Sequence, residues 1–491
     1  MNRTLSIVVL MFLATNLIAQ KPVNRLTYDE VMQLAKDQSP QAILAKHRFR
    51  AAYWQNRTYV AELRPNLTLT GTIPQFSRSI IRYQNADGSY TYIEENSNTT
   101  SLGLSLSQNI GLTGGQIFVR SNLERTDLLG SNKTTSYLSV PVSIGFSQPL
   151  FAMNQLKWSK RIEPIKYEEA KQTFIQSMEE ISIEATRLFF DLAMAQQNLE
   201  TAKLNYSNTD TLYKIAQGRY NIGTIAENEL LQMELSFLNA GTALSDAEVD
   251  LQLKKIRLKS YLGLNDMYDL EIVIPESIPS FDLDFQRVLT LAKEKNPQIL
   301  SYQRQLLEAD RDVAQARSER GFNANLYATF GLTQRATELG NAYIDPQDQQ
   351  TVRIGITVPI LDWGLGSGKV KMAQSNREVV RTSVDQALTD FEQDVFLKVM
   401  QFNRQDDQVQ IAKKADLVSQ NRYEVTKQRF LIGKIDVLTL NVAQTERDQA
   451  KQKYINTLSS FWQYFYQMRR LTLHDLEKNQ PLTTDFELLL Q

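Results

Sequence analysis

Few residues in this sequence have the types and spacing that acid–base, nucleophilic or metal chemistry requires. There is no cysteine, which removes thiol nucleophiles, thiolate metal sites and disulfides. The two histidines, His47 and His474, lie far apart and have no neighbours at ligand spacing. Residues 364–369 resemble a phosphate-binding loop, but that pattern needs glycine where Trp363 stands and serine or threonine where Val370 stands. Without a Ser-His-acid grouping, a carboxylate pair or a metal cluster, we expect neither an enzyme nor a cofactor site.

An internal repeat is the most informative pattern in the chain. Residues 213–223 (YKIAQGRYNIG) are echoed by residues 423–433 (YEVTKQRFLIG), and residues 34–41 share their LAK and PQ pairs with residues 291–298. The repeating unit is about half of the chain, so the sequence predicts two similar halves and not a solenoid of short repeats.

The two copies differ in length at one place. Pro40 and Pro297 are 257 residues apart, whereas Gly145 and Gly355 are 210 residues apart. The first copy therefore carries 47 additional residues, which lie between Asn66 and Gly145. They form either a longer external loop or an additional hairpin.

The chain begins with the features of an exported protein. A short polar segment precedes an apolar run over residues 5–17, and Ala19 follows as a small residue suited to signal peptidase. Residues 1–20 are predicted to be a cleavable signal peptide, and the lack of cysteine excludes a lipoprotein anchor. The formal net charge of −1 argues against a general nucleic-acid binder. After residue 20 no run of about 18 apolar residues appears, so membrane insertion would require β-structure.

Alternating polar and apolar residues predict strands with two different faces in both halves. These strands fall at residues 67–69, 102–106 and 140–146, and again at residues 326–332 and 352–358. Two to four strands per half are too few to close an outer-membrane barrel, which needs about eight. If the strands lie in a membrane, several protomers must share one barrel. The alternative is a soluble β-sandwich between coiled coils.

Long helices account for most of the remaining sequence. Helices are predicted over residues 26–63, 155–216, 226–262, 369–428 and 436–471. A helix of about 60 residues would be about 90 Å long, which suits a rod better than a compact core. The two longest carry apolar residues at alternating steps of four and three, the spacing of a coiled-coil seam. The seam residues are Ile181, Ala185, Leu188, Leu192, Ala195, Leu199 and Ala202 in the first half, and Val384, Leu388, Phe391 and Val395 in the second.

This order of elements, given twice, resembles the TolC-type outer-membrane efflux factors. The resemblance covers residues 26–471. Its most specific marks are the Tyr220-Asn-Ile-Gly223 turn with Glu229-Leu-Leu, the Phe430-Leu-Ile-Gly433 turn, and the strand-to-helix joints at residues 148–151 and 358–364.

The resemblance implies a mixed, mainly α fold. A long coiled-coil α-helical barrel would be combined with a twelve-stranded transmembrane β-barrel shared between the protomers of a homotrimer. Such a protein would be the exit duct of a tripartite efflux or secretion system in the outer membrane of a Gram-negative bacterium, with its helical domain in the periplasm. It would passively conduct substrates from a periplasmic adaptor (membrane fusion) protein and an inner-membrane pump, and would contact outer-membrane lipid but no nucleic acid. The alternative is a periplasm-spanning coiled-coil scaffold or adaptor without a membrane barrel.

The predicted domain organisation follows from the repeat. The tail is expected to be poorly ordered or peripheral. The predicted parts are the signal peptide (1–20), a first repeat (21–262, with a strand region at 66–148 and a tip turn near 217–224), an equatorial linker (263–281), a second repeat (282–472, with a strand region at 322–360 and a tip turn near 428–434) and a C-terminal extension (473–491).

The resemblance also assigns roles to residues at the two turns. In the family, the glycine of this turn lies at the periplasmic tip, where adaptor hairpins dock and the tunnel narrows. The plainer reading is that each glycine caps a helix and serves as a hinge. The residues implied in tip and adaptor docking are Arg219, Tyr220, Gly223, Arg429, Phe430 and Gly433.

Acidic residues near that entrance form a ring in the family, which makes Glu229 and Asp436 candidates for an entrance constriction. The copies differ here, because Thr439 occupies the position equivalent to Glu229. Asp436 could instead be an acid that stabilises the start of a helix. Trp158 and Trp363 follow the last strand of each half and are candidate membrane-interface aromatics, with local packing as the alternative.

Overall fold

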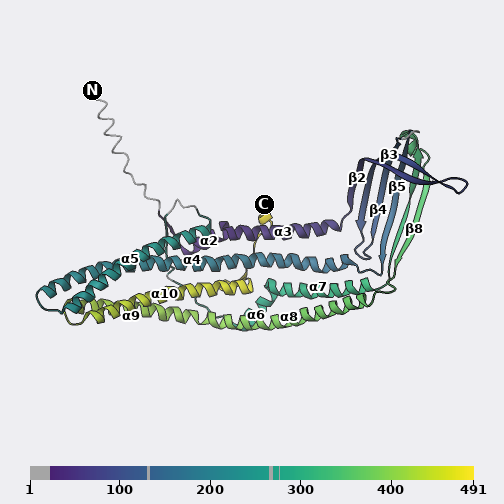
Figure 1. Cartoon of the computed structure of the whole chain (residues 1–491). Coiled ribbons are helices and arrows are strands. Elements are labelled where there is room, and N and C mark those ends of the chain that lie inside the picture. Colours follow the sequence, from purple (N-terminus) through teal and green to yellow (C-terminus); the bar gives the residue numbers. More distant parts are fainter. Residues whose placement is uncertain (1–22, 130–132, 265–268, 276, 491) are drawn as a thin grey trace, which may run out of the picture. The chain divides into compact units, whose positions relative to one another are not determined.

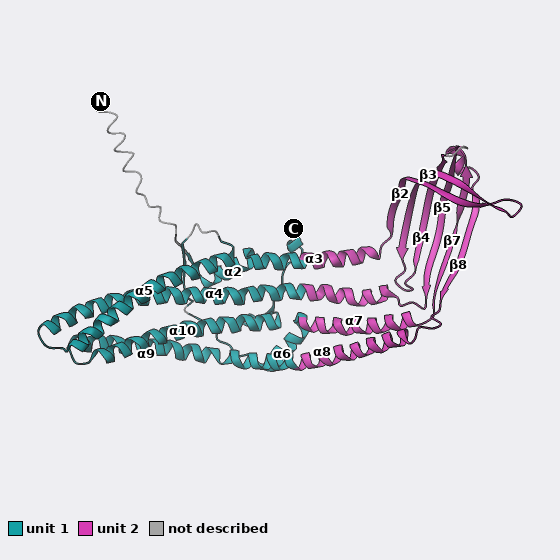
Figure 2. Cartoon of the chain, viewed as in Figure 1, with its two compact units in different colours: residues 1–49, 171–297, 390–491 teal, residues 50–170, 298–389 magenta. Residues whose placement is uncertain are grey.

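The computed structural model describes residues 23–129, 133–264, 269–275 and 277–490 (Figure 1). The predicted signal peptide and part of the predicted linker lie outside these residues. The chain is mainly helical and divides into two compact units (Figure 2). Unit 1 comprises residues 1–49, 171–297 and 390–491, and unit 2 comprises residues 50–170 and 298–389.

The predicted helices are present, with some changes in their bounds. No helix in the described part of the chain is both long enough and apolar enough to cross a membrane. The helices are α2 (Tyr28–Gln38), α3 (Pro40–Glu62), α4 (Gln155–Asn221), α5 (Glu227–Leu262), α6 (Phe285–Lys295), α7 (Pro297–Arg320), α8 (Leu365–Asn403), α9 (Gln405–Leu431) and α10 (Val437–Thr472).

The first predicted helix is wrong in one respect, because it is two helices preceded by a short strand. Thr27 caps α2 through a capping box with Glu30. The helix then stops at Ser39, which is extended, with φ −61° and ψ 147°. Pro40 causes this break, since proline disfavours the helical conformation in the residue before it. Ser39 Oγ accepts a hydrogen bond from the Ala42 N–H at 3.1 Å and so caps α3.

The long helix predicted over residues 369–428 is also divided. Helix α8 ends at Asn403 and α9 begins at Gln405. The Asn403 side-chain amide bonds both the N–H and the C=O of Leu283, each at 3.0 Å. The break between α8 and α9 therefore lies where the segment that precedes α6 is hydrogen-bonded to the end of α8.

The core of unit 1 contains the predicted seam of α4 except Leu199, which is half-buried. Leu192 and Ala185 are fully buried, and Tyr28 of α2 packs edge-on against Phe189 with ring centroids 5.2 Å apart. The C-terminal extension is less peripheral than expected. It contains strands β9 (His474–Asp475) and β10 (Gln480–Pro481), and the Phe486 ring lies 5.0 Å from that of Phe49. A second small sheet of unit 1 pairs β1 (Val23–Leu26) with β6 (Asp269–Ile272) in parallel.

Unit 2 contains one antiparallel sheet with the strand order β2-β3-β4-β5-β7-β8 (Figure 2). Residues 66–150 supply four of these strands and residues 323–357 supply two, so the segment in which the two halves differ in length contains two further strands. The sequence did not predict β4. The strands are β2 (Asn66–Gln84), β3 (Tyr90–Asn109), β4 (Gln116–Leu128), β5 (Thr134–Leu150), β7 (Asn323–Ala336) and β8 (Gln347–Thr357).

The strand register gives the sheet one apolar and one polar face. Leu67 pairs with Leu106, Leu106 with Val119 and Val119 with Ile144, which places these residues in one cross-strand row. Most of this face is exposed in the single chain. The apolar face is formed by Leu67, Leu69, Leu102, Leu104, Leu106, Ile117, Val119, Leu123, Ile144, Phe146, Leu326, Ala328, Phe330, Val352, Ile354 and Ile356.

Strands β2 and β3 continue beyond the rest of the sheet. The last pair between β3 and β4 is Ser97 with Leu128, whereas β2 and β3 stay paired as far as Gln84 and Tyr90. The turn at the end has Gly88 at φ +84°. This hairpin is the projecting loop of the sheet in Figure 1.

Candidate functional site: the two helix turns of unit 1

The two repeated sequence motifs form the same backbone turn. Gly223 follows α4 with φ +73°, and Gly433 follows α9 with φ +72°. In each turn the glycine N–H bonds the carbonyl three residues earlier, at 2.8 Å to Tyr220 and at 2.9 Å to Phe430. The next N–H bonds the carbonyl five residues earlier, at 2.9 Å from Thr224 to Arg219. These are helix C-caps with a left-handed residue, where glycine has no steric penalty.

The two turns share one small core. The buried residues come from all four helices that meet there, and Figure 1 shows both turns at the same end of the helices of unit 1. Phe430 belongs to this core, so its role is packing as well as any docking. The core consists of Leu212, Ala216, Met233, Tyr423, Phe430 and Leu440.

Arg219 connects the first turn to the second. Its guanidinium donates a hydrogen bond to the Leu431 carbonyl at 3.4 Å and lies 6.0 Å from the centre of the Phe430 ring. Arg429, its counterpart in the second repeat, is exposed. Among the described residues, no ion pair joins either arginine to Glu229 or Asp436. The two arginines are therefore not equivalent.

The two candidate acids lie at the first turn of their helices. Asp436 is the N-cap of α10, and its carboxylate accepts the Thr439 N–H at 2.9 Å. The hydroxyl and the backbone N–H of Thr439 both lower the pKa of Asp436. At the equivalent position before α5, Ala226 provides no side-chain cap, and Glu229 lies one turn further on. The acid of the second repeat thus has the capping role that the sequence allowed as the alternative.

Both acids nevertheless line a common cavity. This cavity has a volume of about 390 Å³, and its lining includes Arg219, Glu229, Gly433, Lys434 and Asp436. Two acidic and two basic side chains therefore face one space between the turns. Such a lining can attract ions of either sign.

Two exposed isoleucines at the turns were not singled out from the sequence. Ile222 is 74% exposed and Ile432 is 65% exposed, and each immediately precedes its glycine. Tyr220 beside them is 40% exposed. Exposed apolar side chains that lie close together are typical of a contact surface. Their recurrence in both repeats was the signal that could have identified them.

The two tryptophans have different environments. Trp158 lies in the first turn of α4, half-buried, with the Arg161 guanidinium 5.4 Å from its ring. Trp363 lies between β8 and α8, is 90% exposed and has φ +54°. Trp363 is thus exposed, whereas Trp158 has a local packing partner.

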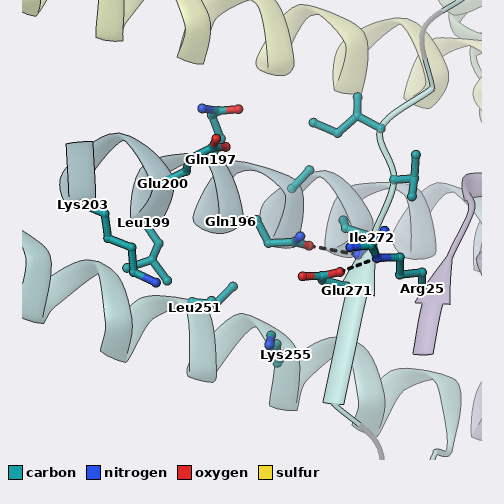
Figure 3. Close-up of a pocket in the computed structure, with 13 residues that line it drawn as sticks. Arg25, Gln196, Gln197, Leu199, Glu200, Lys203, Leu251, Lys255, Glu271 and Ile272 are labelled. Atoms are coloured by element: carbon teal, nitrogen blue, oxygen red, sulfur yellow. Dashed lines mark hydrogen bonds and ion pairs between the residues drawn. The ribbon is translucent and has the colours of Figure 1, made fainter. Parts of the chain in front are cut away.

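A larger cavity of about 570 Å³ lies elsewhere in unit 1, between α4, α5 and the β1–β6 pair (Figure 3). Its charged lining is largely paired internally. Arg25 bonds Glu271 at 2.7 Å, and Gln196 Oε1 accepts the Ile272 N–H at 3.1 Å. The buried Lys255 bonds Asp269 at 2.6 Å. These contacts attach residues 269–274 to the helices, so we assign this cavity a structural role.

Comparison with solved structures shows the same fold at low sequence identity. The outer membrane channel CmeC of Campylobacter jejuni matches with a TM-score of 0.67 and 16% identity, over 94% of this chain and 88% of that chain. The outer membrane protein VceC of Vibrio cholerae matches with a TM-score of 0.63 and 15% identity, over 93% of this chain and 97% of that chain. The open-state MtrE outer membrane channel of Neisseria gonorrhoeae matches with a TM-score of 0.59 and 14% identity, over 93% and 91%.

Sequence comparison identifies the family. A search of curated proteins finds no significant match. The family model described as outer membrane efflux protein matches residues 116–264 and 288–472, which is more than half of the chain. The chain therefore belongs to the outer membrane efflux protein family.

Proposed function

We propose that this protein is the trimeric exit duct of a tripartite efflux or secretion system. It would conduct substrates passively across the outer membrane from a periplasmic adaptor and an inner-membrane pump. In this proposal the chain has two repeats, residues 21–262 and 282–472, joined by an equatorial linker at residues 263–281. A cleavable signal peptide would direct its export.

The observation that carries the proposal is the exposed apolar face of the sheet in unit 2. Leu67, Leu69, Val352, Ile354 and Ile356 are each at least 60% exposed in the single chain. An apolar surface that continues across six strands is far larger than the patches of a soluble monomer. The opposite face carries mainly serine, threonine, asparagine and glycine, so the sheet has the alternation of a barrel wall between lipid and water.

The two edges of the sheet support a barrel shared between protomers. The edge strands are β2 and β8, and neither has a second neighbour among the described residues. Because the strands alternate in direction through an even number, β8 of one protomer could pair antiparallel with β2 of the next. Three six-stranded sheets would supply eighteen strands in place of the twelve expected from the resemblance.

Two exposed helical stripes in unit 1 support the trimer independently. On α5, the residues Leu231, Leu235 and Leu238 have coiled-coil spacing and are all more than half exposed. On α9, Ile411, Val418 and Val425 recur every seven residues and are also more than half exposed. A coiled-coil seam needs apolar residues from two helices, and each stripe supplies those of one helix. We propose that α5 of one protomer packs against α9 of the next.

The turns of unit 1 are proposed to be the adaptor-docking tips. Their exposed isoleucines, with Tyr220 and Arg429, would form the docking surface. Glu229 and Asp436 would contribute to the entrance constriction. Trp363 would lie at the membrane interface, with Trp158 packed locally. The capped glycine turns support this assignment because they hold the paired tips in a fixed shape.

Fractionation and channel recording together test the duct against the alternative scaffold. We expect the mature protein in the outer-membrane fraction, as an oligomer that runs differently on gels before and after heating. The purified protein should conduct ions in planar lipid bilayers. A mature chain found as a soluble periplasmic monomer without conductance would contradict the duct and favour the periplasm-spanning scaffold or adaptor.

A further inference from the structure

The polar face of the sheet carries a ladder of two arginines and two aromatic rings. Arg120 and Phe118 are on β4, Tyr327 is on β7 and Arg353 is on β8. The Arg120 guanidinium lies 3.9 Å from the centre of the Phe118 ring. The Phe118 and Tyr327 rings are stacked with their centroids 5.8 Å apart, and the Arg353 guanidinium lies 5.9 Å from the Tyr327 ring. Both guanidinium contacts are within the range of cation–π attraction.

The ladder depends on a glycine in the intervening strand. Phe118 pairs with Gly145 of β5, and its ring lies across that residue towards β7. A Cβ atom at residue 145 would be 2.2 Å from the Phe118 ring, so only glycine leaves room for it. Phe118 is 2% exposed as a result. The Phe118 ring is thus a fixed support with little free surface of its own, and Tyr327 beside it is half-buried.

The two arginines are exposed and unneutralised on this support. Among the described residues, neither guanidinium takes part in an ion pair. The strand register places Arg335 of β7 and Glu124 of β4 on the same face, further along the strands. On strands β4, β5, β7 and β8, this face therefore carries three positive charges and one negative charge in each protomer. Its polar neighbours are uncharged Thr329, Thr351 and Ser143.

We propose that Arg120 and Arg353 form an anion-attracting belt on the inner wall of the barrel. This inference rests on the proposed duct, because only a closed barrel would turn the polar face into a passage. Three protomers would place six supported guanidinium groups around it. A passage lined by one sign of charge raises the local concentration of the opposite ion. The belt would favour small anions such as chloride, phosphate or a carboxylate, and would oppose the acids proposed for the entrance.

The test measures ion selectivity of the full-length protein in planar bilayers. The reversal potential in a KCl gradient gives the permeability ratio of chloride to potassium. We expect Arg120→Gln with Arg353→Gln to lower this ratio by about twofold or more, with single variants intermediate. Arg120→Lys with Arg353→Lys should stay near wild type, because the charge is kept. Addition of sulfate should reduce the chloride current of wild type more than that of the double glutamine variant.

Arg82→Gln is the matched control. Arg82 also lies over an aromatic ring, 4.4 Å from the centre of Tyr90, but on the projecting hairpin and on the other face of its strand. Its replacement should leave the permeability ratio unchanged. An unchanged ratio in both single variants and in the double variant overturns the belt, while the duct stands. An equal shift in Arg82→Gln also overturns it. Absence of conductance in wild type overturns the duct, and the belt with it.

Discussion

Gly223 and Gly433 have nearly identical backbone conformations, with φ of +73° and +72°, although 210 residues separate them. Each ends a helix, and each is followed by the same pair of backbone hydrogen bonds. Neither would meet another atom within 4 Å if it carried a Cβ, so space does not explain the choice of glycine. The left-handed conformation does, because other residues are strained there. The agreement supports the proposal of a duplicated hairpin.

Alanine at Gly433 should therefore loosen the tip without a clash. We expect Gly433→Ala to make local opening easier by about 1 kcal/mol, or about fivefold, because alanine is strained at positive φ. Hydrogen exchange of peptides that cover the turn measures this opening. Gly218→Ala is the control, since Gly218 lies inside α4 with space for a Cβ, and there alanine should be neutral or stabilising. Equal protection in the two variants would contradict the capping argument.

The dependence of protein stability on pH should show that Asp436 caps its helix. Because Thr439 lowers the pKa of Asp436, the cap stabilises the fold above the unfolded-state pKa of about 3.9 and is lost as pH falls through the lower folded value. We expect Asp436→Asn to remain stable at pH 7 and to lose this acid sensitivity, since asparagine also caps. Asp436→Ala should unfold at a lower temperature at pH 7.

The same variants separate capping from an entrance role. Asparagine keeps the cap but removes the charge, so a change in conductance or cation selectivity of Asp436→Asn reports on the entrance alone. Glu229→Gln provides the comparison, because Ala226 leaves its helix uncapped and the exposed Glu229 has no capping role to lose. Unchanged conductance and selectivity in the combined variant would remove both acids from the entrance.

The periodicity of apolar residues made the helices predictable. The breaks within the predicted helices were missed. The seam of α4 could be located because its buried side recurs every three or four residues. The break at Ser39 had a local signal in Pro40, which the prediction did not use. The break at Arg404 had none, since it coincides with the attachment of Leu283 to Asn403. A contact across 120 residues leaves no trace in the local pattern.

Strand β4 and the arginine ladder could not be predicted from the sequence for a related reason. The charged residues Arg120, Glu124 and Asp127 make the sequence of β4 resemble a polar loop. An antiparallel strand can carry such residues, because one face of the sheet can be exposed to water. Phe118 meets Tyr327 only through the register of three strands, which the sequence does not fix. The two glycine turns were easier to predict, because the sequence presents the same motif twice.

Glu179 should be essential for the stability of unit 1. It is almost fully buried and accepts hydrogen bonds from Lys36 and Arg469, each at 2.8 Å. Glu179→Gln would leave Lys36 without its counter-charge and would leave Arg469 with Asp475 as its one remaining carboxylate partner among the described residues. We expect a loss of about 3 kcal/mol in the free energy of unfolding. Glu180→Gln is the control, because Glu180 is exposed and pairs with Arg470 at 3.4 Å, and it should cost less than about 1 kcal/mol. Similar unfolding midpoints for the two variants would contradict this.

Leu235 should be needed for the trimer but not for the fold of the protomer. Leu235→Glu places a charge in the exposed stripe of α5, where the proposed neighbour would bury it. We expect dissociation by native mass spectrometry or light scattering, with an unchanged helical circular dichroism signal. Gln232→Glu adds the same charge to the same helix about a quarter turn from the centre of the stripe formed by Leu231, Leu235 and Leu238, and should leave the oligomer intact. A trimer that tolerates Leu235→Glu would exclude this stripe from the interface.

Replacement of Gly145 by alanine should destabilise the protein, whereas the same replacement at Gly355, its counterpart in the second half, should not. Gly145→Ala drives a Cβ into the Phe118 ring at 2.2 Å, and overpacking of this kind costs about 1–3 kcal/mol. Gly355→Ala is the matched control, because its nearest atom would be the Asn325 carbonyl oxygen at 4.0 Å. The temperature at which the oligomer loses its heat-modifiable gel migration measures the effect. The two closest contacts are with the Phe118 ring and the third is with Thr329 Cγ2 at 2.9 Å, so Phe118→Ala should remove most of the additional cost of Gly145→Ala. Full persistence of that cost in the double variant would show that the ring is not the cause.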